Sequence, residues 1–257
     1  KMQIFFRVSL FLLWLTIIAP TSAYAKEVDV GRCPTDSCKF IPKIDGVVSA
    51  DEWESATKIT DFVQIKPVEY GDPTENTIVF LTITDSTFYI AAKLYDQSPS
   101  DIVAKVSRQG ARISSDDFFR VQIDTFNSKR AGYRFQVNMN SVRNEGIFLN
   151  ITSINDDWTS IWEAKATQTS YGWSAEIAIP FKSLSFDPDM DVWGFNVFRY
   201  ISRKNELISW ITRNQESNIS VSGSLRGFKG VEKGLWKAFD GRSTDCWENL
   251  ARILTYV

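Results

Sequence analysis

The stretch GWSAEIAIPFKSL, residues 172–184, decides the fold class. In its first half, apolar residues occupy every second position: Trp173, Ala175, Ile177 and Ile179. Such an alternation predicts a half-buried β-strand. Pro180 ends the strand, because proline cannot donate to a strand ladder. The spacing of Phe181 and Leu184 predicts one helical turn that places both side chains on one face.

The same period of two recurs along most of the chain and predicts many more strands. They are expected at 62–66, 77–84, 87–96, 118–126, 133–140, 146–149, 161–167, 193–201, 207–211 and 224–228. A capping-box spacing of Ser49 and Glu52 predicts a short helix over 50–56. A second helix is expected from Pro99 to about residue 106. The fold class predicted is all-β: a two-sheet antiparallel β-sandwich, jelly-roll-like, with one or two short helices.

The first residues carry the pattern of a secretory signal peptide. A basic start is followed by an apolar run over 8–18 and by small residues at Ala23 and Ala25. The run is short for a membrane span, which needs roughly 20 residues. We therefore expect residues 1–25 to be removed on export, to the periplasm, the outer membrane or the medium. Residues 26–40 are predicted to be a linker.

The composition excludes several kinds of chemistry. The chain has no histidine, which rules out a Ser-His-Asp triad, His-ligated zinc and the usual proximal haem ligand. We expect neither haem nor zinc. A formal net charge of −2 gives no basic excess for nucleic acid. In an exported protein, Cys33 and Cys38 are spaced for one local disulfide, with Cys246 left over; the alternative is no disulfide.

Several motifs follow one another in a recognisable order. They are KIDGVVSADEW (43–53), SRQGARISSDDFFRVQIDTF (107–126), YRFQVNMNSVRNEG (133–146), IWEA (161–164), GWSAEIAIPFKSLSF (172–186), WGFNVFRYISRKNELISW (193–210) and SGSLRGF (222–228). In this order they resemble a family 9 carbohydrate-binding-type domain. The version resembled stands at the N-terminus of exported bacterial proteins that often continue into an outer-membrane β-barrel. The resemblance spans 41–230 and implies a carbohydrate-binding β-sandwich there, with the 172–179 strand inside it.

The chain departs from the resembled pattern after Gly230. Residues 231–257 lack the alternation of barrel strands. This atypical tail indicates either a natural stand-alone domain or a truncated or frame-shifted product, and we favour the second.

Carbohydrate binding, as the resemblance implies it, needs aromatic rings on which pyranose faces stack. Trp158 is the first candidate, because it lies in the polar stretch NDDWTSIW between predicted strands, where a loop aromatic is a stronger sign of binding than a core one. Trp162 and Tyr171 come next. A structural lid over the sandwich edge is the alternative role for Trp158. The remaining tryptophans at strand or capping positions are expected in the core: Trp53, Trp173, Trp193 and Trp210.

Two further sites are expected from charged residues. Resembled modules often carry structural calcium, which takes loop carboxylates as ligands, and Asp117 and Asp157 are the best candidates. Arg199 falls in phase with the apolar residues of its strand, so it should be buried and need a carboxylate partner. Glu176 is the predicted partner, in a structural ion pair.

These observations favour a non-catalytic polysaccharide- or oligosaccharide-binding module of a secreted or cell-envelope protein, serving carbohydrate catabolism. No oligomer is predicted. The first alternative is a glycoside hydrolase acting on O-glycosyl bonds, which would need two carboxylates across the scissile bond. The second is a periplasmic interaction or plug domain of a truncated barrel protein, without sugar affinity.

Overall fold

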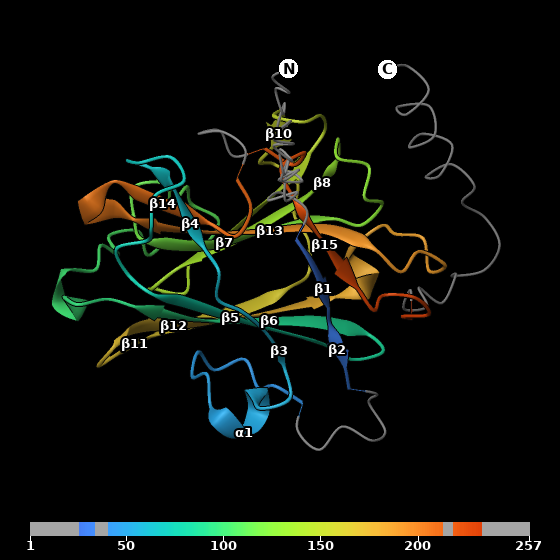
Figure 1. Cartoon of the computed structure of the whole chain (residues 1–257), viewed down its shortest axis with the longest axis horizontal. Helices are drawn as coiled ribbons and strands as arrows, with labels where there is room; N and C mark the ends of the chain where they lie inside the picture. Colours follow the sequence, from blue (N-terminus) through green and yellow to red (C-terminus); the bar gives the residue numbers. More distant parts are fainter. Residues whose placement is uncertain (1–25, 34–40, 213–217, 233–257) are drawn as a thin grey trace, which may run out of the picture.

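Two stacked β-sheets make up the part of the chain that this computed structural model describes, residues 26–33, 41–212 and 218–232 (Figure 1). The larger sheet contains nine strands: β1 (Glu27–Asp29), β4 (Val63–Lys66), β7 (Phe118–Asp124), β8 (Gly132–Asn138), β9 (Arg143–Phe148), β10 (Ile154–Asn155), β13 (Trp193–Ile201), β14 (Glu206–Ser209) and β15 (Gly223–Arg226). The smaller sheet contains six: β2 (Gly31–Arg32), β3 (Thr57–Ile59), β5 (Thr77–Ile83), β6 (Thr87–Tyr95), β11 (Glu163–Thr169) and β12 (Gly172–Pro180).

The strand order confirms the sandwich but not a purely antiparallel one. The larger sheet runs β1-β15-β13-β7-β8-β9-β10, with β14 and β4 attached beside β13, and the smaller runs β11-β12-β6-β5-β2, with β3 beside β5. Most neighbours are antiparallel, whereas β1 lies parallel to β15 and β2 parallel to β5. Both parallel strands come from residues expected as a linker. They are too short to show an alternation, as are β3 and β10, which were also not predicted.

The core lies between the sheets, where the alternation predicted it. The inward side chains of β12 and β13 are fully buried. At one end, the Trp193 and Phe228 rings stack 4.0 Å apart, and the Phe181 ring meets both edge-on. Phe181 opens η2 (Phe181–Ser183), the single 3₁₀ turn expected after Pro180. The turn therefore closes the core at the point where β12 can no longer continue.

The outward face of β12 is buried as well, which corrects the expectation of a half-buried strand. Helix α1 (Ala50–Trp53) and the turn before it cover this face, below the smaller sheet in Figure 1. Trp53 Nε1 donates to Glu176 Oε1 over 2.9 Å, and the Gly46 amide donates to Glu176 Oε2 over 2.8 Å. Gly46 has φ +90°, and a Cβ there would lie 2.6 Å from Thr167 Oγ1. Only glycine fits this turn.

The helices are shorter than the sequence predicted. Helix α1 ends at Trp53, and Ser49 Oγ donates to the Glu52 carboxylate over 2.9 Å and makes no hydrogen bond to the backbone of α1. The expected second helix is a single 3₁₀ turn, η1 (Pro99–Asp101), and the chain is extended from Ile102. No helix in the described ranges is long and apolar enough to cross a membrane.

Strand β13 pairs with β7 along one edge and with two different strands along the other. Its first residues pair with β15 and its last with β14. Asn196 lies at the division, fully buried, and its Nδ2 donates to the carbonyls of Ile211 and Val221 over 2.9 and 2.8 Å. Its Oδ1 accepts from Ser209 Oγ and from two backbone amides. One side chain thus replaces the ladder bonds that are missing where the two strands diverge.

Both chain ends lie outside the described residues, so the predicted signal peptide at 1–25 and most of the 231–257 tail stay predictions. Cys33 is disulfide-bonded. Both possible partners, Cys38 and Cys246, fall outside the described ranges, and the Cys33–Cys38 pairing stays a prediction as well.

Candidate functional site

The outer face of the larger sheet carries large polar side chains that are nearly buried. We call this set the polar floor; it consists of Arg120, Gln122, Arg134, Gln136 and Asn144. They are cross-strand neighbours, because Arg120 pairs with Gln136, Gln122 with Arg134, and Gln136 with Asn144. Four of them expose between 1% and 9% of their surface, and Arg120 is half-buried. Burying polar groups is costly, so such a set on one face of a sheet needs a reason.

Loops on either side of the polar floor account for its burial. On one side, Ile113 and Val106 of the segment after η1 pack on Phe118 of β7 and on Val142. On the other side, the Ile219 side chain lies against Gly132, close enough that a Cβ on this glycine would approach it to 2.9 Å. The floor is therefore bordered by packed loops rather than being an open sheet surface.

A chain of hydrogen bonds fixes the side chains of the polar floor. Arg120 Nε donates to Gln136 Oε1 over 2.8 Å, and Gln136 Nε2 donates to Asn144 Oδ1 over 2.8 Å. Arg134 Nη2 donates to the same Asn144 oxygen over 2.7 Å and to Asp156 Oδ1 over 2.9 Å. Each rotamer is held by its neighbour, so the floor is organised before any ligand arrives.

Arg120 has an aromatic neighbour as well. Its guanidinium carbon lies 4.4 Å from the centroid of the Phe118 ring, which stacks in turn on Tyr200 at 5.4 Å. Burial, and to a smaller extent the nearby Arg134 charge, lowers the pKa of the Arg120 guanidinium to about 9. Arg120 is still protonated at neutral pH, so it presents a charged donor over an aromatic face.

The three aromatic residues proposed from the sequence do not form one platform. Trp158 is half-buried against the Tyr133 and Phe135 rings, 5.1 and 6.1 Å away. Trp162 is 2% exposed and packs edge-on against the same Phe135 ring, at 5.1 Å. Tyr171 lies elsewhere, against Tyr95 of β6. Sugar binding by any of the three stays a prediction.

The described tryptophans offer little open ring surface. Trp158 is half-buried, and all the others are buried, as expected for core positions: Trp53, Trp162, Trp173, Trp193 and Trp210. Among described aromatic residues, only Tyr70 and Phe126 are exposed, at 46% and 48%. Any ligand on the polar floor would therefore be held mainly by hydrogen bonds from the polar floor side chains.

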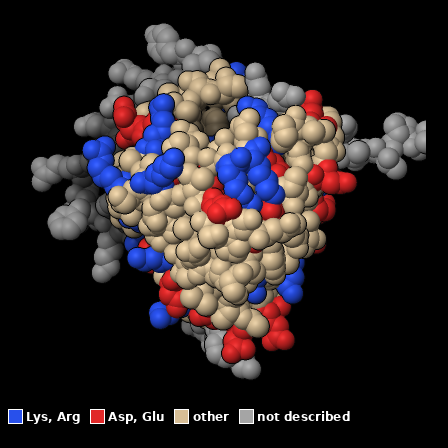
Figure 2. Space-filling model, turned by 90° about the vertical axis from the view of Figure 1, so that its left-hand side faces the viewer, with Lys and Arg blue, Asp and Glu red and all other residues tan. Residues whose placement is uncertain are grey.

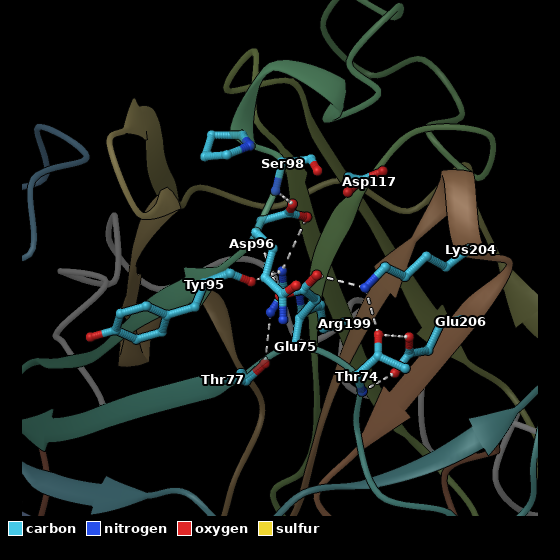
Figure 3. A network of polar contacts seen from close by, with 12 residues as sticks. Thr74, Glu75, Thr77, Tyr95, Asp96, Ser98, Asp117, Arg199, Lys204 and Glu206 are labelled. Atoms are coloured by element: carbon cyan, nitrogen blue, oxygen red, sulfur yellow. Dashed lines mark hydrogen bonds and ion pairs between the residues drawn. The ribbon is translucent and has the colours of Figure 1, made fainter.

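A second polar cluster lies at one end of the sandwich, where the sheets meet (Figure 3). Arg199 of β13 is 1% exposed and points inward, as its phase predicted. Its terminal nitrogens donate to Asn76 O over 2.9 Å and Tyr95 O over 2.5 Å, and the Asp96 carboxylate lies 3.9 Å away. Asp96 of the smaller sheet, not Glu176, is thus the ion-pair partner. The prediction of Glu176 was wrong, because Glu176 faces outward under α1.

This cluster, the ionic network, joins basic and acidic side chains. Arg203 grips Asp96 with two hydrogen bonds of 2.6 and 2.8 Å. Lys204 Nζ donates to Glu75 Oε1 over 2.6 Å, and Glu206 accepts two hydrogen bonds from Thr74 (Figure 3). Three basic side chains, Arg199, Arg203 and Lys204, share the cluster with four buried acidic ones: Glu75, Asp96, Asp117 and Glu206. The network ties the turn between β13 and β14 to the smaller sheet, which is a structural role.

The expected calcium ligands are not brought together. Asp117 is buried, and its Oδ1 accepts from the Ser202 amide over 2.9 Å; burial raises the pKa of its carboxyl. Asp157 is exposed in the loop before Trp158. The described ranges contain no group of three acidic, cysteine or histidine side chains placed to hold a metal ion. Calcium at Asp117 and Asp157 stays a prediction.

The end of the molecule at the left of Figure 1 is marked by charge and shape. Figure 2 shows Lys and Arg side chains gathered on this end, with a hollow near its top, on the side of the larger sheet. Basic groups therefore stand at the surface beside the sheet that carries the polar floor.

Sequence reasoning missed the polar floor. Its residues alternate with core residues on β7 and β8, and outward polar positions are normally read as a solvent face. One signal was present: the outward positions hold long amides and guanidiniums on paired strands, rather than a mixture of Lys, Glu and Ser.

Comparison with known proteins supports the fold. No protein-family profile matches the sequence, and no curated protein matches it significantly. Among solved structures, a family 9 carbohydrate-binding module from Caldicellulosiruptor kristjanssonii in complex with cellotriose matches with a TM-score of 0.53 and 18% identity, covering 85% of this chain and 100% of the module. The complex with glucose matches over 82% of this chain and 100% of the module, with the same score and identity.

A third solved structure is a Bacteroides uniformis protein to which carbohydrate binding is ascribed. It matches with a TM-score of 0.58 and 12% identity, over 78% of this chain and 98% of that protein. At these identities the comparisons establish a fold resembling family 9 carbohydrate-binding modules.

Proposed function

We propose that this protein is a non-catalytic carbohydrate-binding module that holds its ligand on the polar floor. The observation that carries the proposal is a row of charged and amide side chains, fixed by one another and bordered by loops on one face of the sheet. Such groups bind sugar hydroxyls, because guanidinium and amide N–H groups donate to the hydroxyl oxygen and amide oxygens accept from the hydroxyl O–H. The likeness to modules solved with cellotriose and glucose supports a sugar as ligand.

The described residues give less support to a glycoside hydrolase. Hydrolysis needs two carboxyl groups facing each other across the bond to be cleaved. The polar floor has one carboxylate beside it, Asp156, and this group is bound by Arg134 and lies 3.4 Å from Arg112. Within the described ranges, no second acidic side chain makes an ion pair or a side-chain hydrogen bond with the polar floor. We therefore place binding, not turnover, at this site.

An interaction domain without sugar affinity is the second candidate. It is favoured by one observation, the lack of an open tryptophan face among the described residues. We propose export and a cell-envelope context for either function, in line with the N-terminal signal pattern.

The test is retention of the purified protein on insoluble cellulose, xylan, chitin and peptidoglycan, together with titration of soluble oligosaccharides. We expect retention on at least one glycan and its loss in Gln136→Ala, which removes the centre of the hydrogen-bond chain. The matched control is Lys58→Ala, because Lys58 is exposed on β3 of the opposite sheet. Folded protein that binds no glycan would overturn the proposal and favour the interaction domain.

A further inference from the structure

Arg120 uses only part of its hydrogen-bonding capacity. A guanidinium has five N–H donors, and the single hydrogen bond of Arg120 within the described residues is the one from Nε to Gln136. No carboxylate of the described ranges lies within 4.0 Å of it. Nη1 and Nη2 donate to no described residue. These two nitrogens form the end of the guanidinium whose parallel N–H bonds match the two oxygens of a carboxylate.

The neighbouring Arg134 is engaged through one nitrogen. Nη2 donates to Asn144 Oδ1, to Asp156 Oδ1 and to the Glu145 carbonyl. Nε is buried and has no acceptor, and Nη1 donates to no described residue. Arg134 therefore adds positive charge beside Arg120 and keeps donors of its own.

Positive charge at the polar floor exceeds negative charge. Arg112, Arg120 and Arg134 stand near two carboxylates: Asp156, which is divided between Arg112 and Arg134, and Glu145, whose charge also acts on Arg134. Charge that is removed from water without a partner is unfavourable, and the lowered pKa of Arg120 expresses the same imbalance. A neutral sugar can accept hydrogen bonds here but cannot balance the charge, whereas an anionic sugar can do both.

We infer that the polar floor selects acidic glycans, and that Arg120 binds the carboxylate of a uronic acid unit through Nη1 and Nη2. The inference rests on the proposed function, since it names the class of glycan for the same site. A planar carboxylate can accept two parallel N–H bonds from this end of the guanidinium. The Phe118 ring packs against one face of the guanidinium and so leaves its edge, with Nη1 and Nη2, for the carboxylate.

The test compares two ligands that differ in one group: polygalacturonate and the same polymer with its carboxylates reduced to alcohols. Calorimetric titration in buffer with about 0.15 M salt limits general charge attraction. We expect the acidic polymer to bind roughly tenfold to a hundredfold more tightly, the effect of a hydrogen bond to a charged group. Arg120→Gln should bring the two affinities together, and Arg120→Lys should keep part of the difference.

The matched control is Arg130→Gln, which removes the same charge from the exposed turn between β7 and β8. It should leave the preference unchanged; an equal loss in this variant would mean general charge attraction and overturn the inference. Equal binding of both polymers, or tighter binding of dextran sulfate, would overturn it while carbohydrate binding stands. Binding to no glycan at all would instead defeat the proposed function. Near-ultraviolet circular dichroism confirms folding, and Arg120→Lys serves if Arg120→Gln does not fold.

Discussion

Arg199 and Arg120 lie on paired strands of the larger sheet and face opposite sides of it. Arg199, on β13, points into the sandwich, where its terminal nitrogens donate to Asn76, Thr77 and Tyr95 and where four acidic side chains of the ionic network surround it. Arg120, on β7, points outward, with one hydrogen bond and no acidic partner in the described ranges. The difference teaches that burial alone does not mark an arginine as structural. A structural arginine is marked instead by hydrogen bonds from its terminal nitrogens and by acidic side chains around it.

The strongest way to test this comparison is to unbalance the ionic network. Asp96→Ala removes the carboxylate that Arg203 grips with two hydrogen bonds and that lies beside Arg199. It leaves a buried guanidinium without its counter-charge, so we expect a loss of about 3–5 kcal/mol in unfolding free energy. Urea denaturation followed by tryptophan fluorescence measures it. If the variant does not fold, Arg203→Gln measures the same contact from its more exposed side.

The control for this change lies at the polar floor. Asp156 is partly exposed, and Asp156→Ala should cost about 1 kcal/mol or less. Equal losses in the two variants would break the distinction between a structural network and an open site.

Glu176 provides a third arrangement, a buried charge with neutral donors only. Its carboxylate accepts from Trp53 Nε1 and from the Asp45 and Gly46 amides, yet burial outweighs these bonds and raises its pKa from 4.5 to about 7. The folded state therefore holds this proton at higher pH than the unfolded chain does. The resulting stability is complete below pH 4.5 and is lost as pH rises through 7, by at most about 3 kcal/mol.

Glu176→Gln checks the sign of this effect. The variant lacks the titrating group. Between pH 5 and pH 8 its unfolding free energy should therefore fall less than that of the wild-type protein. Denaturation curves at several pH values compare the two slopes. A wild-type stability that rises over this range relative to the variant would contradict the assignment.

The sequence predicted the elements with a clear period of two and the 3₁₀ turn that ends β12. It also predicted that Arg199 is buried with a carboxylate nearby. The partner was wrong for a reason visible in the alternation: Glu176 is in phase with Ser174, on the face away from the core, whereas Arg199 is in phase with core residues. Asp96 could not be found this way, because the pairing joins two sheets through distant segments. The polar floor was missed since its cover of loops is a tertiary feature.

Trp158 sharpens the comparison for aromatic residues. Its ring packs on Tyr133 and Phe135, whose side chains face the core, whereas the polar floor lies on the other face of β8. Trp158→Ala should cost about 2 kcal/mol of stability for the apolar surface it uncovers and leave glycan retention unchanged. Denaturation and pull-down of the same variant measure both. A folded variant that loses retention would return Trp158 to the binding site.

The smallest effect is expected where charges pair at the surface. Arg226 Nε donates to Glu27, and both side chains are about half exposed. Water and salt screen such a pair, and the parallel backbone ladder of β1 and β15 remains when the carboxylate is removed. Glu27→Gln should therefore leave the melting temperature unchanged within error, in low salt and in high salt alike. A fall approaching that of Asp96→Ala would show that pairing at the sandwich surface, and not only the buried ionic network, stabilises this fold.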